Sequence, residues 1–190
     1  GTVLGRGGSD WSASIIASAL DASRVEIWTD VDGMRTTDPR VCPDTCRIPR
    51  ISYEEAAQMA RFGAKVLHPK TIAPAVARNI PVLVLNSSNP SCEGTAVVPE
   101  EAPDGPRGIA FKRNVYLVRF SPKAEGDFMW CLEESRIEPD MVTSAGRQMM
   151  VTVDFPHNIG GFIRLVAGKT DILLKTGYSQ LTVIGRGLLS

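Results

Sequence analysis

The stretch Leu4–Gly33, LGRGGSDWSASIIASALDASRVEIWTDVDG, places a glycine-rich turn before a run of small residues and a short apolar segment. The small-residue run predicts a helix, whose N-terminus exposes unpaired N–H groups with partial positive charge. Glycines in the turn let backbone amides approach a ligand, so the junction suits a phosphate or a carboxylate. The spacing fits neither the dinucleotide fingerprint nor the P-loop, and a strand-to-helix turn capped by Ser9 or Asp10 is the plainer alternative.

Strand and helix patterns alternate along the first half of the chain. Val25–Thr29 predicts a strand that ends in polar residues, where parallel sheets place their ligand groups. Ser52 and Glu55 form a capping box ahead of a helical segment that stops at a glycine. Ile80–Asn86 is nearly continuous in apolar residues, as in strands buried on both faces. This alternation predicts an α/β fold.

The second half of the chain follows another plan. Residues 89–108 are dense in proline, glycine and acidic residues, a composition typical of a domain boundary. Beyond them, the predicted order strand, helix, strand, strand, helix, strand is the ferredoxin-like βαββαβ plan, with its last strand near Ile172–Lys175. Residues 179–190 predict one more strand, which begins or completes a neighbouring unit.

The composition is that of a soluble globular protein. Among 190 residues, 43% are hydrophobic, and 21 Lys and Arg residues balance 21 Asp and Glu residues. We therefore expect no nucleic-acid partner and no membrane association. The four scattered cysteines indicate a reducing compartment, with the cytoplasm as the default location. Cys42 and Cys46 have no second Cys or His pair at zinc spacing, so no metal site is expected.

Three motifs together resemble one family: GRGGSD from Gly5, VEIWTDVDGMRTTDPR from Val25, and SYEEAAQMARFGAKVLHP from Ser52. In this order and spacing they are similar to the carboxyl-terminal half of the catalytic domain of aspartate kinases, which belong to the amino acid kinase family. The segment RGIAFKRNVYLVRF from Arg107 continues the resemblance into the family's ACT regulatory domain. The resemblance implies a partial three-layer amino acid kinase fold with a mainly parallel sheet, followed by a ferredoxin-like ACT domain.

Domain boundaries follow from the same resemblance. Residues 1–100 correspond to the carboxyl-terminal half of the catalytic domain, 101–112 to a linker, 113–178 to the ACT domain, and 179–190 to a strand of a second ACT unit. The family's amino-terminal Lys-Phe-Gly-Gly loop, which embraces the phosphates, has no counterpart here, and the chain starts with Gly1 rather than Met. We therefore expect a fragment that is not a competent kinase by itself.

The resemblance implies ATP-dependent phosphorylation of the L-aspartate side-chain carboxylate to 4-phospho-L-aspartate, the first step of lysine, threonine and methionine biosynthesis. ATP would act as its Mg²⁺ complex, with no tightly bound cofactor. Phosphoryl transfer demands positioning and charge neutralisation. The expected catalytic residues are Arg6, which would grip an aspartate carboxylate in bidentate geometry, and Asp10, which would pair with the substrate ammonium group or orient catalytic lysines. Gly7, Gly8 and Ser9 would supply hydrogen-bond donors to the substrate.

The family's nucleotide site maps onto Thr29, Asp30, Arg35, Arg40, Lys65 and Val66. Thr29 and Asp30 can hydrogen-bond base or ribose hydroxyls, whereas cationic side chains such as Arg40 offset phosphate charge. Arg35 stands where the family usually has a tyrosine or another aromatic residue. Simpler alternatives exist for each residue: a turn cap at Asp30, an ion pair of Arg40 with Asp38, and a solvated lysine at the helix end.

For the ACT portion, the resemblance implies feedback control by an amino acid end product, most often lysine or threonine. The expected effector site comprises Gly126, Asp127, Phe128, Pro139, Asp140 and Ser144. Asp140 would meet the effector's ammonium group and the Gly126 region its carboxylate, although a surface carboxylate and a helix-start glycine are equally ordinary features. ACT domains pair edge to edge, so a homodimer is expected, with burial of strand edges as its physical motive.

Two other functions stay open at this stage. One is a non-catalytic regulatory subunit that senses an amino acid through its ACT domain. The other is a different amino acid kinase, acting on glutamate, acetylglutamate or a nucleotide monophosphate. That second alternative gives no reason for an ACT-like segment to follow the kinase motifs.

Overall fold

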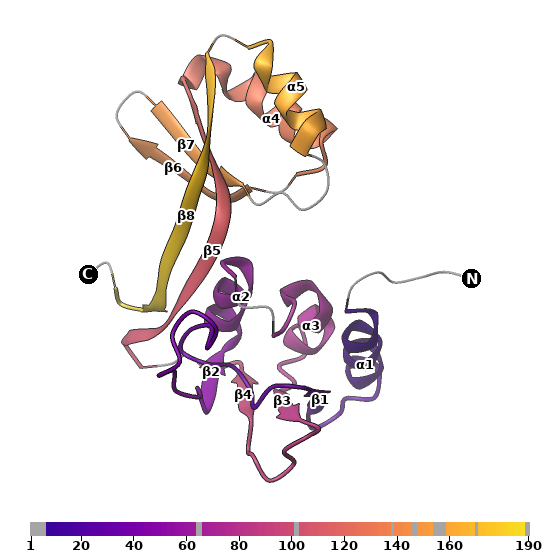
Figure 1. The fold of residues 1–190 in the computed structure, drawn as a ribbon. Coiled ribbons are helices and arrows are strands. Elements are labelled where there is room, and N and C mark those ends of the chain that lie inside the picture. Colours follow the sequence, from indigo (N-terminus) through magenta and orange to yellow (C-terminus); the bar gives the residue numbers. More distant parts are fainter. Residues whose placement is uncertain are drawn as a thin grey trace. The chain divides into compact units, whose positions relative to one another are not determined.

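The computed structural model describes residues 7–63, 66–100, 103–137, 139–145, 148–153, 159–169 and 171–188. The chain divides into two compact units (Figure 1): Gly1–Phe111 together with Leu181–Ser190, and Lys112–Gln180. We describe each unit by itself.

The first unit contains a four-stranded sheet with the strand order β1-β3-β4-β2. Its strands are β1 (Val25–Thr29), β2 (Arg50–Ser52), β3 (Val82–Asn86) and β4 (Thr95–Val98). β1 is parallel to β3 and β2 is parallel to β4, whereas β3 and β4 are antiparallel. The carboxyl ends of β1 and β3 therefore lie side by side, with Thr29 opposite Asn86. The predicted α/β fold with a mainly parallel sheet is confirmed.

The helices of the first unit lie on the same side of this sheet in Figure 1. In the described residues they are α1 (Gly8–Ala19), α2 (Tyr53–Arg61) and α3 (Pro69–Val76). α3 packs against both α1 and α2. The predicted capping box at the start of α2 is present: Ser52 Oγ accepts the Glu55 N–H, and the Glu55 carboxylate accepts the Ser52 N–H, each at 3.2 Å.

Aliphatic side chains of β3 and β4 form the centre of the first core. Val82, Val84 and Val97 have no exposed surface, and removing such side chains from water is the main contribution to the stability of a core. Leu83 and Leu85 alternate with them and are only half-buried. The expected burial of β3 on both faces is therefore incomplete in the structure, because the described helices cover one face of the sheet.

The second unit has the predicted βαββαβ order. Its elements are the part of β5 (Gly105–Phe120) from Lys112 onward, the short 3-10 helix η1 (Pro122–Ala124), α4 (Glu125–Glu134), β6 (Pro139–Ala145), β7 (Gln148–Val153), α5 (Ile159–Ala167) and the part of β8 (Ile172–Arg186) up to Gln180. The strand order β6-β7-β5-β8 places the first and third strands of the unit at the centre of the sheet, which is the ferredoxin-like arrangement. Its core includes Phe128, whose ring stacks on Phe120 with centroids 4.3 Å apart and meets Phe162 edge-on at 6.2 Å.

Two segments differ from the sequence-based expectation. Residues 105–112, expected as part of a linker, belong to β5, and residues 179–186, expected as a separate strand, continue β8. The physical reason is long-range burial: Ala110 and Ile184 lie in the core of the first unit, with exposed fractions of 3% and 1%. The proline and glycine content of residues 105–112 is typical of a linker, but burial and strand pairing make this segment part of a strand.

None of the helices in the described segments has the length and apolar content that a membrane crossing requires. All four cysteines are free thiols, and burial raises the pKa of the Cys131 thiol in the second core. Within the described residues, no group of three or more His, Cys, Asp or Glu side chains is placed to hold a metal ion.

Candidate functional site

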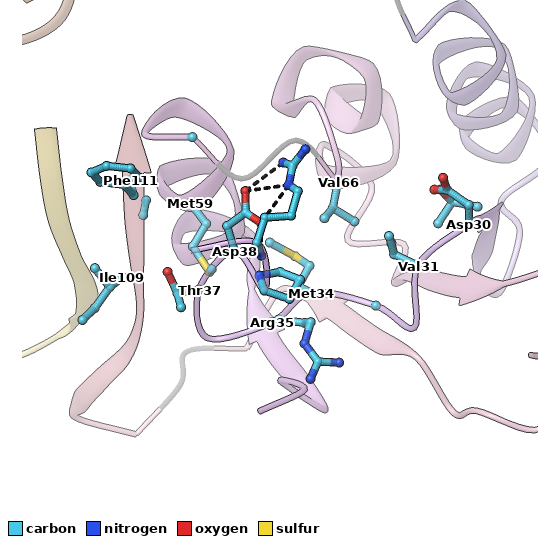
Figure 2. A pocket seen from close by; sticks show the side chains of 16 residues that line it. Asp30, Val31, Met34, Arg35, Thr37, Asp38, Met59, Val66, Ile109 and Phe111 are labelled. Carbon is cyan, nitrogen blue, oxygen red and sulfur yellow. Dashed lines mark hydrogen bonds and ion pairs between the residues drawn. The ribbon is translucent and has the colours of Figure 1, made fainter. Parts of the chain in front are cut away.

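A cavity of about 480 Å³ opens beside the carboxyl end of β1 in the first unit (Figure 2). Its volume lies in the range of small-molecule sites. The cavity is lined by Thr29, Asp30, Val31, Gly33, Met34, Arg35, Thr37, Asp38, Pro39, Arg40, Met59, Gly63, Val66, Ile109, Ala110 and Phe111. This wall includes every residue of the predicted nucleotide set except Lys65, which lies outside the described residues.

A short two-stranded ribbon, residues 34–48, forms one side of the cavity. The Ile48 N–H donates to the Met34 carbonyl at 2.8 Å, and the Thr36 N–H donates to the Cys46 carbonyl at 2.9 Å. Between these two bonds, Arg35 and Arg47 form an antiparallel bridge. The 34–48 ribbon therefore has its base at Met34 and Ile48 and carries the segment 37–45 as its tip.

The tip of the ribbon holds an aspartate–arginine pair that faces the cavity. Asp38 accepts hydrogen bonds from Arg40 Nε at 3.0 Å and Arg40 Nη2 at 2.8 Å, and its Oδ1 also accepts the Arg40 backbone N–H at 2.9 Å. The bonds to the Asp38 carboxylate raise the pKa of Arg40 above its ordinary value. This is the ion pair that the simpler alternative expects. It also orients the guanidinium at the cavity wall, which Asp38 and Arg40 both line.

The end of β1 contributes a second polar group. Thr29 Oγ1 donates to the Asp30 carboxylate at 3.1 Å, and the Thr29 carbonyl accepts bonds from the Ser87 N–H and hydroxyl at 2.9 and 3.0 Å. The bonds from Ser87 fix the backbone at the strand end. Asp30 is exposed at the cavity wall, so its carboxylate is placed to meet a polar ligand.

Asp32 does not line the cavity and instead has a structural role. Its Oδ1 accepts hydrogen bonds from Asn86 Nδ2 at 2.7 Å and Asn89 Nδ2 at 3.1 Å. These bonds, first the one from Asn86, lower the pKa of Asp32 below its ordinary value of 3.8. Asp32 thus joins the loop after β1 to the loop after β3.

Arg35 lines the cavity, but its guanidinium is engaged elsewhere. Nε donates to Thr45 Oγ1 and Nη2 donates to the Thr45 carbonyl, both at 2.6 Å. In Figure 2 the guanidinium points away from the Asp38–Arg40 pair. The side chain therefore braces the tip of the ribbon, which is a different role from the ligand contact that the sequence predicts at this position.

The apolar part of the cavity wall was missed in the sequence analysis. Met34 and Met59 are almost fully buried, with exposed fractions of 1% and 2%, and Ile109 and Phe111 come from the start of β5. The Ile109 N–H donates to the Thr36 carbonyl at 2.7 Å, which attaches β5 to the ribbon. No local signal identifies these residues, because the contact joins positions far apart in the sequence.

The glycine-rich turn before α1 is not part of this cavity wall. Gly7 is the N-cap of α1 with a φ of 72°, and neither Ser9 nor Asp10 caps the helix, contrary to the plainer alternative. A Cβ at Gly7 would lie 2.6 Å from Thr71 Cγ2, so α3 approaches the turn closely. Gly8, Ser9 and Asp10 form the first turn of α1. Arg6 lies outside the described residues.

The predicted effector residues fall on α4 and β6 of the second unit. Gly126, Asp127 and Phe128 lie in the first turns of α4 rather than in a loop. The Phe128 side chain is 1% exposed and packs in the core, which removes it from contact with a ligand. Asp127 pairs with Lys169 Nζ at 3.1 Å. Pro139, Asp140 and Ser144 lie on β6, an edge strand of the sheet.

An α/β sheet with a ligand-sized cavity at the end of a parallel strand, followed by a ferredoxin-like unit, defines the class of protein. The family model of the amino acid kinase family matches residues 1–86 of the chain. The chain's relatives within that family are aspartokinases, so the resemblance stated from the motifs is confirmed.

Three comparisons with aspartokinases of Escherichia coli support this similarity. The lysine-sensitive aspartokinase 3 of strain K12 is 44% identical over 161 residues, covering 80% of this chain and 36% of the relative. The crystal structure of aspartokinase III with aspartate and ADP in the R-state has a TM-score of 0.82 at 37% identity, covering 99% of this chain and 46% of that one. The T-state structure with lysine and aspartate has a TM-score of 0.79 at 37% identity, covering 97% and 44%. The chain thus spans less than half the length of these relatives.

Proposed function

We propose that this chain contributes the nucleotide site and the regulatory unit of an aspartate kinase, which transfers the γ-phosphoryl group of ATP to the side-chain carboxylate of L-aspartate. The observation that carries the proposal is the cavity beside β1. Its wall combines Thr29 and Asp30 with Arg40 and Val66, which lie apart in the sequence and were assigned to the nucleotide from the family resemblance alone. The ADP in the Escherichia coli structure supports the same assignment.

The chemistry of the cavity wall suits a nucleoside phosphate. Met34, Met59 and Val66 give it an apolar surface against which a base can pack. The end of β1 offers a hydroxyl and a carboxylate for ribose or base hydrogen bonds. Arg40, directed by Asp38, supplies the positive charge that a polyphosphate needs. A phosphoryl transfer requires this combination of positioning and charge neutralisation more than covalent help from the protein.

The aspartate substrate is proposed to bind at the turn before α1. Arg6 would grip a carboxylate, and Gly7, Gly8 and Ser9 would donate hydrogen bonds where the helix N-terminus favours negative charge. Asp10 would pair with the ammonium group or orient lysines of the complete enzyme. In the described residues, Gly7 is in the left-handed region that lets the backbone turn into α1.

ATP is proposed to act as its Mg²⁺ complex, in which the ion neutralises the developing charge on the phosphates. Mg²⁺ usually keeps several waters and takes one or two carboxylates besides the phosphate oxygens. Asp30 fits this requirement, because it is an exposed carboxylate in the cavity wall with a hydroxyl as its neighbour. Asp38 is less suited, since Arg40 occupies both of its oxygens.

Regulation is proposed to reside in the second unit as an ACT domain that binds an amino acid, with lysine ahead of threonine. The name of the Escherichia coli relative, lysine-sensitive aspartokinase 3, and its structure with lysine support this order. The edge position of β6 and β8 in the sheet supports a homodimer formed through this unit, because unpaired strand edges are stabilised by pairing.

Calorimetric titration of the 190-residue chain tests the nucleotide assignment directly. We expect ADP to bind and GDP, as a matched control, to bind more weakly, while lysine binds independently at the second unit. Lysine binding without ADP binding would favour the alternative of a purely sensory subunit.

A chimera that joins this chain to the amino-terminal part of the Escherichia coli relative tests the reaction itself. ADP release that does not depend on L-aspartate would refute the proposal.

A further inference from the structure

Thr95 lies under the cavity but belongs to none of the motifs used so far. It is the first residue of β4, pairs with Val84 of β3 and has no exposed surface. We propose that Thr95 positions the nucleotide site: its hydroxyl ties together the two strands of the 34–48 ribbon at their base and so fixes where Asp38 and Arg40 lie. The functional part of this inference rests on the proposed nucleotide site.

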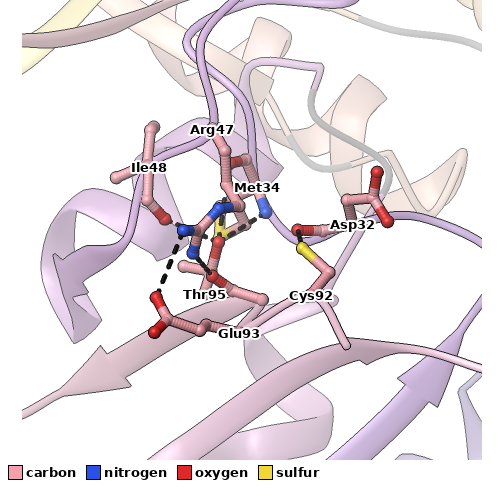
Figure 3. Close-up of polar contacts among 8 residues, drawn as sticks. Asp32, Met34, Arg47, Ile48, Cys92, Glu93 and Thr95 are labelled. Carbon is pink, nitrogen blue, oxygen red and sulfur yellow. Dashed lines mark hydrogen bonds and ion pairs between the residues drawn. The ribbon is translucent and has the colours of Figure 1, made fainter. Parts of the chain in front are cut away.

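The Thr95 hydroxyl acts both as a hydrogen-bond acceptor and as a donor. Oγ1 accepts the Met34 N–H at 2.8 Å and donates its single proton to the Ile48 carbonyl at 2.7 Å. The Met34 carbonyl is farther away, at 3.5 Å, so the proton is directed to Ile48. One buried hydroxyl thus holds the chain where it enters the ribbon and where it leaves it, as Figure 3 shows.

Backbone groups next to these bonds pack closely against Thr95. Gly33 has a φ of 107°, and a Cβ there would lie 2.5 Å from Thr95 Oγ1, so the entry to the ribbon runs directly against the threonine. Arg47 donates to the carbonyl of Gly94, just before β4 in the chain, and forms an ion pair with Glu93 at 3.5 Å. The base of the ribbon is therefore fixed to the sheet through residues 93–95.

The position of the ribbon's base determines the position of the cavity wall, because a short series of backbone hydrogen bonds connects the two. From the base, the next backbone bond joins Thr36 to Cys46, and beyond it the tip turns at Asp38. The Ile109–Thr36 bond is a further contact that sets the direction of the ribbon. Loss of the Thr95 hydroxyl should therefore loosen the Asp38–Arg40 pair relative to the end of β1 without touching a ligand contact.

The experiment compares the 190-residue chain with three variants. Thr95→Val removes the hydroxyl at nearly constant volume, Thr95→Ser keeps it, and Val97→Ala weakens the same strand at a fully buried position away from the ribbon. Amide exchange of Met34, Thr36 and Ile48, measured by NMR without nucleotide, reports the ribbon. Calorimetry reports ADP affinity, and thermal unfolding reports global stability.

We expect Thr95→Val to speed exchange at the three ribbon amides by about tenfold or more and to weaken ADP binding by about tenfold. Thr95→Ser should stay within about threefold on both readouts, and Val97→Ala should lower the melting temperature with ADP affinity unchanged. Unchanged ribbon exchange in Thr95→Val would overturn the inference. So would equal ADP losses in Thr95→Val and Val97→Ala, because the role would then be structural only.

The experiment stays informative if the wild-type chain does not bind ADP or if Thr95→Val does not fold. If the wild-type chain does not bind ADP, the proposed nucleotide site fails, while the exchange data still decide whether Thr95 holds the ribbon. If Thr95→Val does not fold, Gly33→Ala approaches the same contact from the ribbon side, since its Cβ would displace the threonine hydroxyl. The inference requires faster exchange at Met34 in that variant and is overturned if the rate stays at the wild-type value.

Discussion

The cavity of the first unit and the α4 region of the second unit differ in what they do with the residues predicted to bind a ligand. Around the cavity, residues from the end of β1 and from the 34–48 ribbon converge on one space. On α4, Phe128 belongs to the core and Asp127 to an ion pair with Lys169. A residue assigned to a ligand site from the family resemblance must therefore also be checked for burial in the structure.

The largest effect is expected from the core of the second unit. Phe128→Ala should lower the free energy of unfolding of that unit by about 3–5 kcal/mol, because it removes a ring packed between Phe120 and Phe162. Urea denaturation followed by circular dichroism measures this loss. Met129→Ala, one residue along α4 and 50% exposed, is the control and should change little. A small effect of Phe128→Ala would remove the contrast between core and ligand residues on α4.

A smaller but more specific effect is expected at the cavity. Arg40→Met should weaken ADP binding by about tenfold to a hundredfold, the range that follows from losing charge-assisted hydrogen bonds to a phosphate. Calorimetry measures the affinity. Arg24→Met serves as the control, because Arg24 also forms a 2.8 Å ion pair with a carboxylate but does not line the cavity. Equal affinities in wild type and Arg40→Met would limit Arg40 to its pairing with Asp38.

The smallest effect concerns Asp32, which joins the loop after β1 to the loop after β3. Amide donors lower the pKa of Asp32 in the folded chain below its ordinary value of 3.8. The ionised carboxylate therefore stabilises the fold above that value, and this contribution is lost as the pH falls through the lowered pKa. We expect the melting temperatures of wild type and Asp32→Asn to differ near neutral pH and to approach each other below about pH 4. A constant difference across this range would contradict the assignment.

Local signals in the sequence were sufficient for several elements of the fold. The capping box of Ser52 and Glu55 and the strand Val25–Thr29 depend on residues within a few positions of one another. The order of elements in the second unit follows from alternating apolar patterns in the same way. The strand β5 was different, because its proline and glycine content resembles a linker and its burial depends on distant residues.

The residues of the candidate site also divide into those that local sequence signals identify and those that they do not. Thr29, Asp30 and Arg40 could be singled out from motifs, and the Asp38–Arg40 pair could be foreseen from their spacing of two residues. The apolar wall from Ile109 and Phe111 could not, nor could the diversion of Arg35 to Thr45. These depend on which backbone groups face each other after folding.

By itself, the sequence determined the α/β class, the ferredoxin-like second unit and the resemblance to aspartate kinases, because these follow from short-range periodicity and contiguous motifs. Only the tertiary structure decided which residues share a cavity, that Thr95 lies under it, and that Phe128 is a core residue. The physical reason is that hydrogen bonds between distant backbone groups and the burial of side chains are fixed only when the sheets and helices pack together.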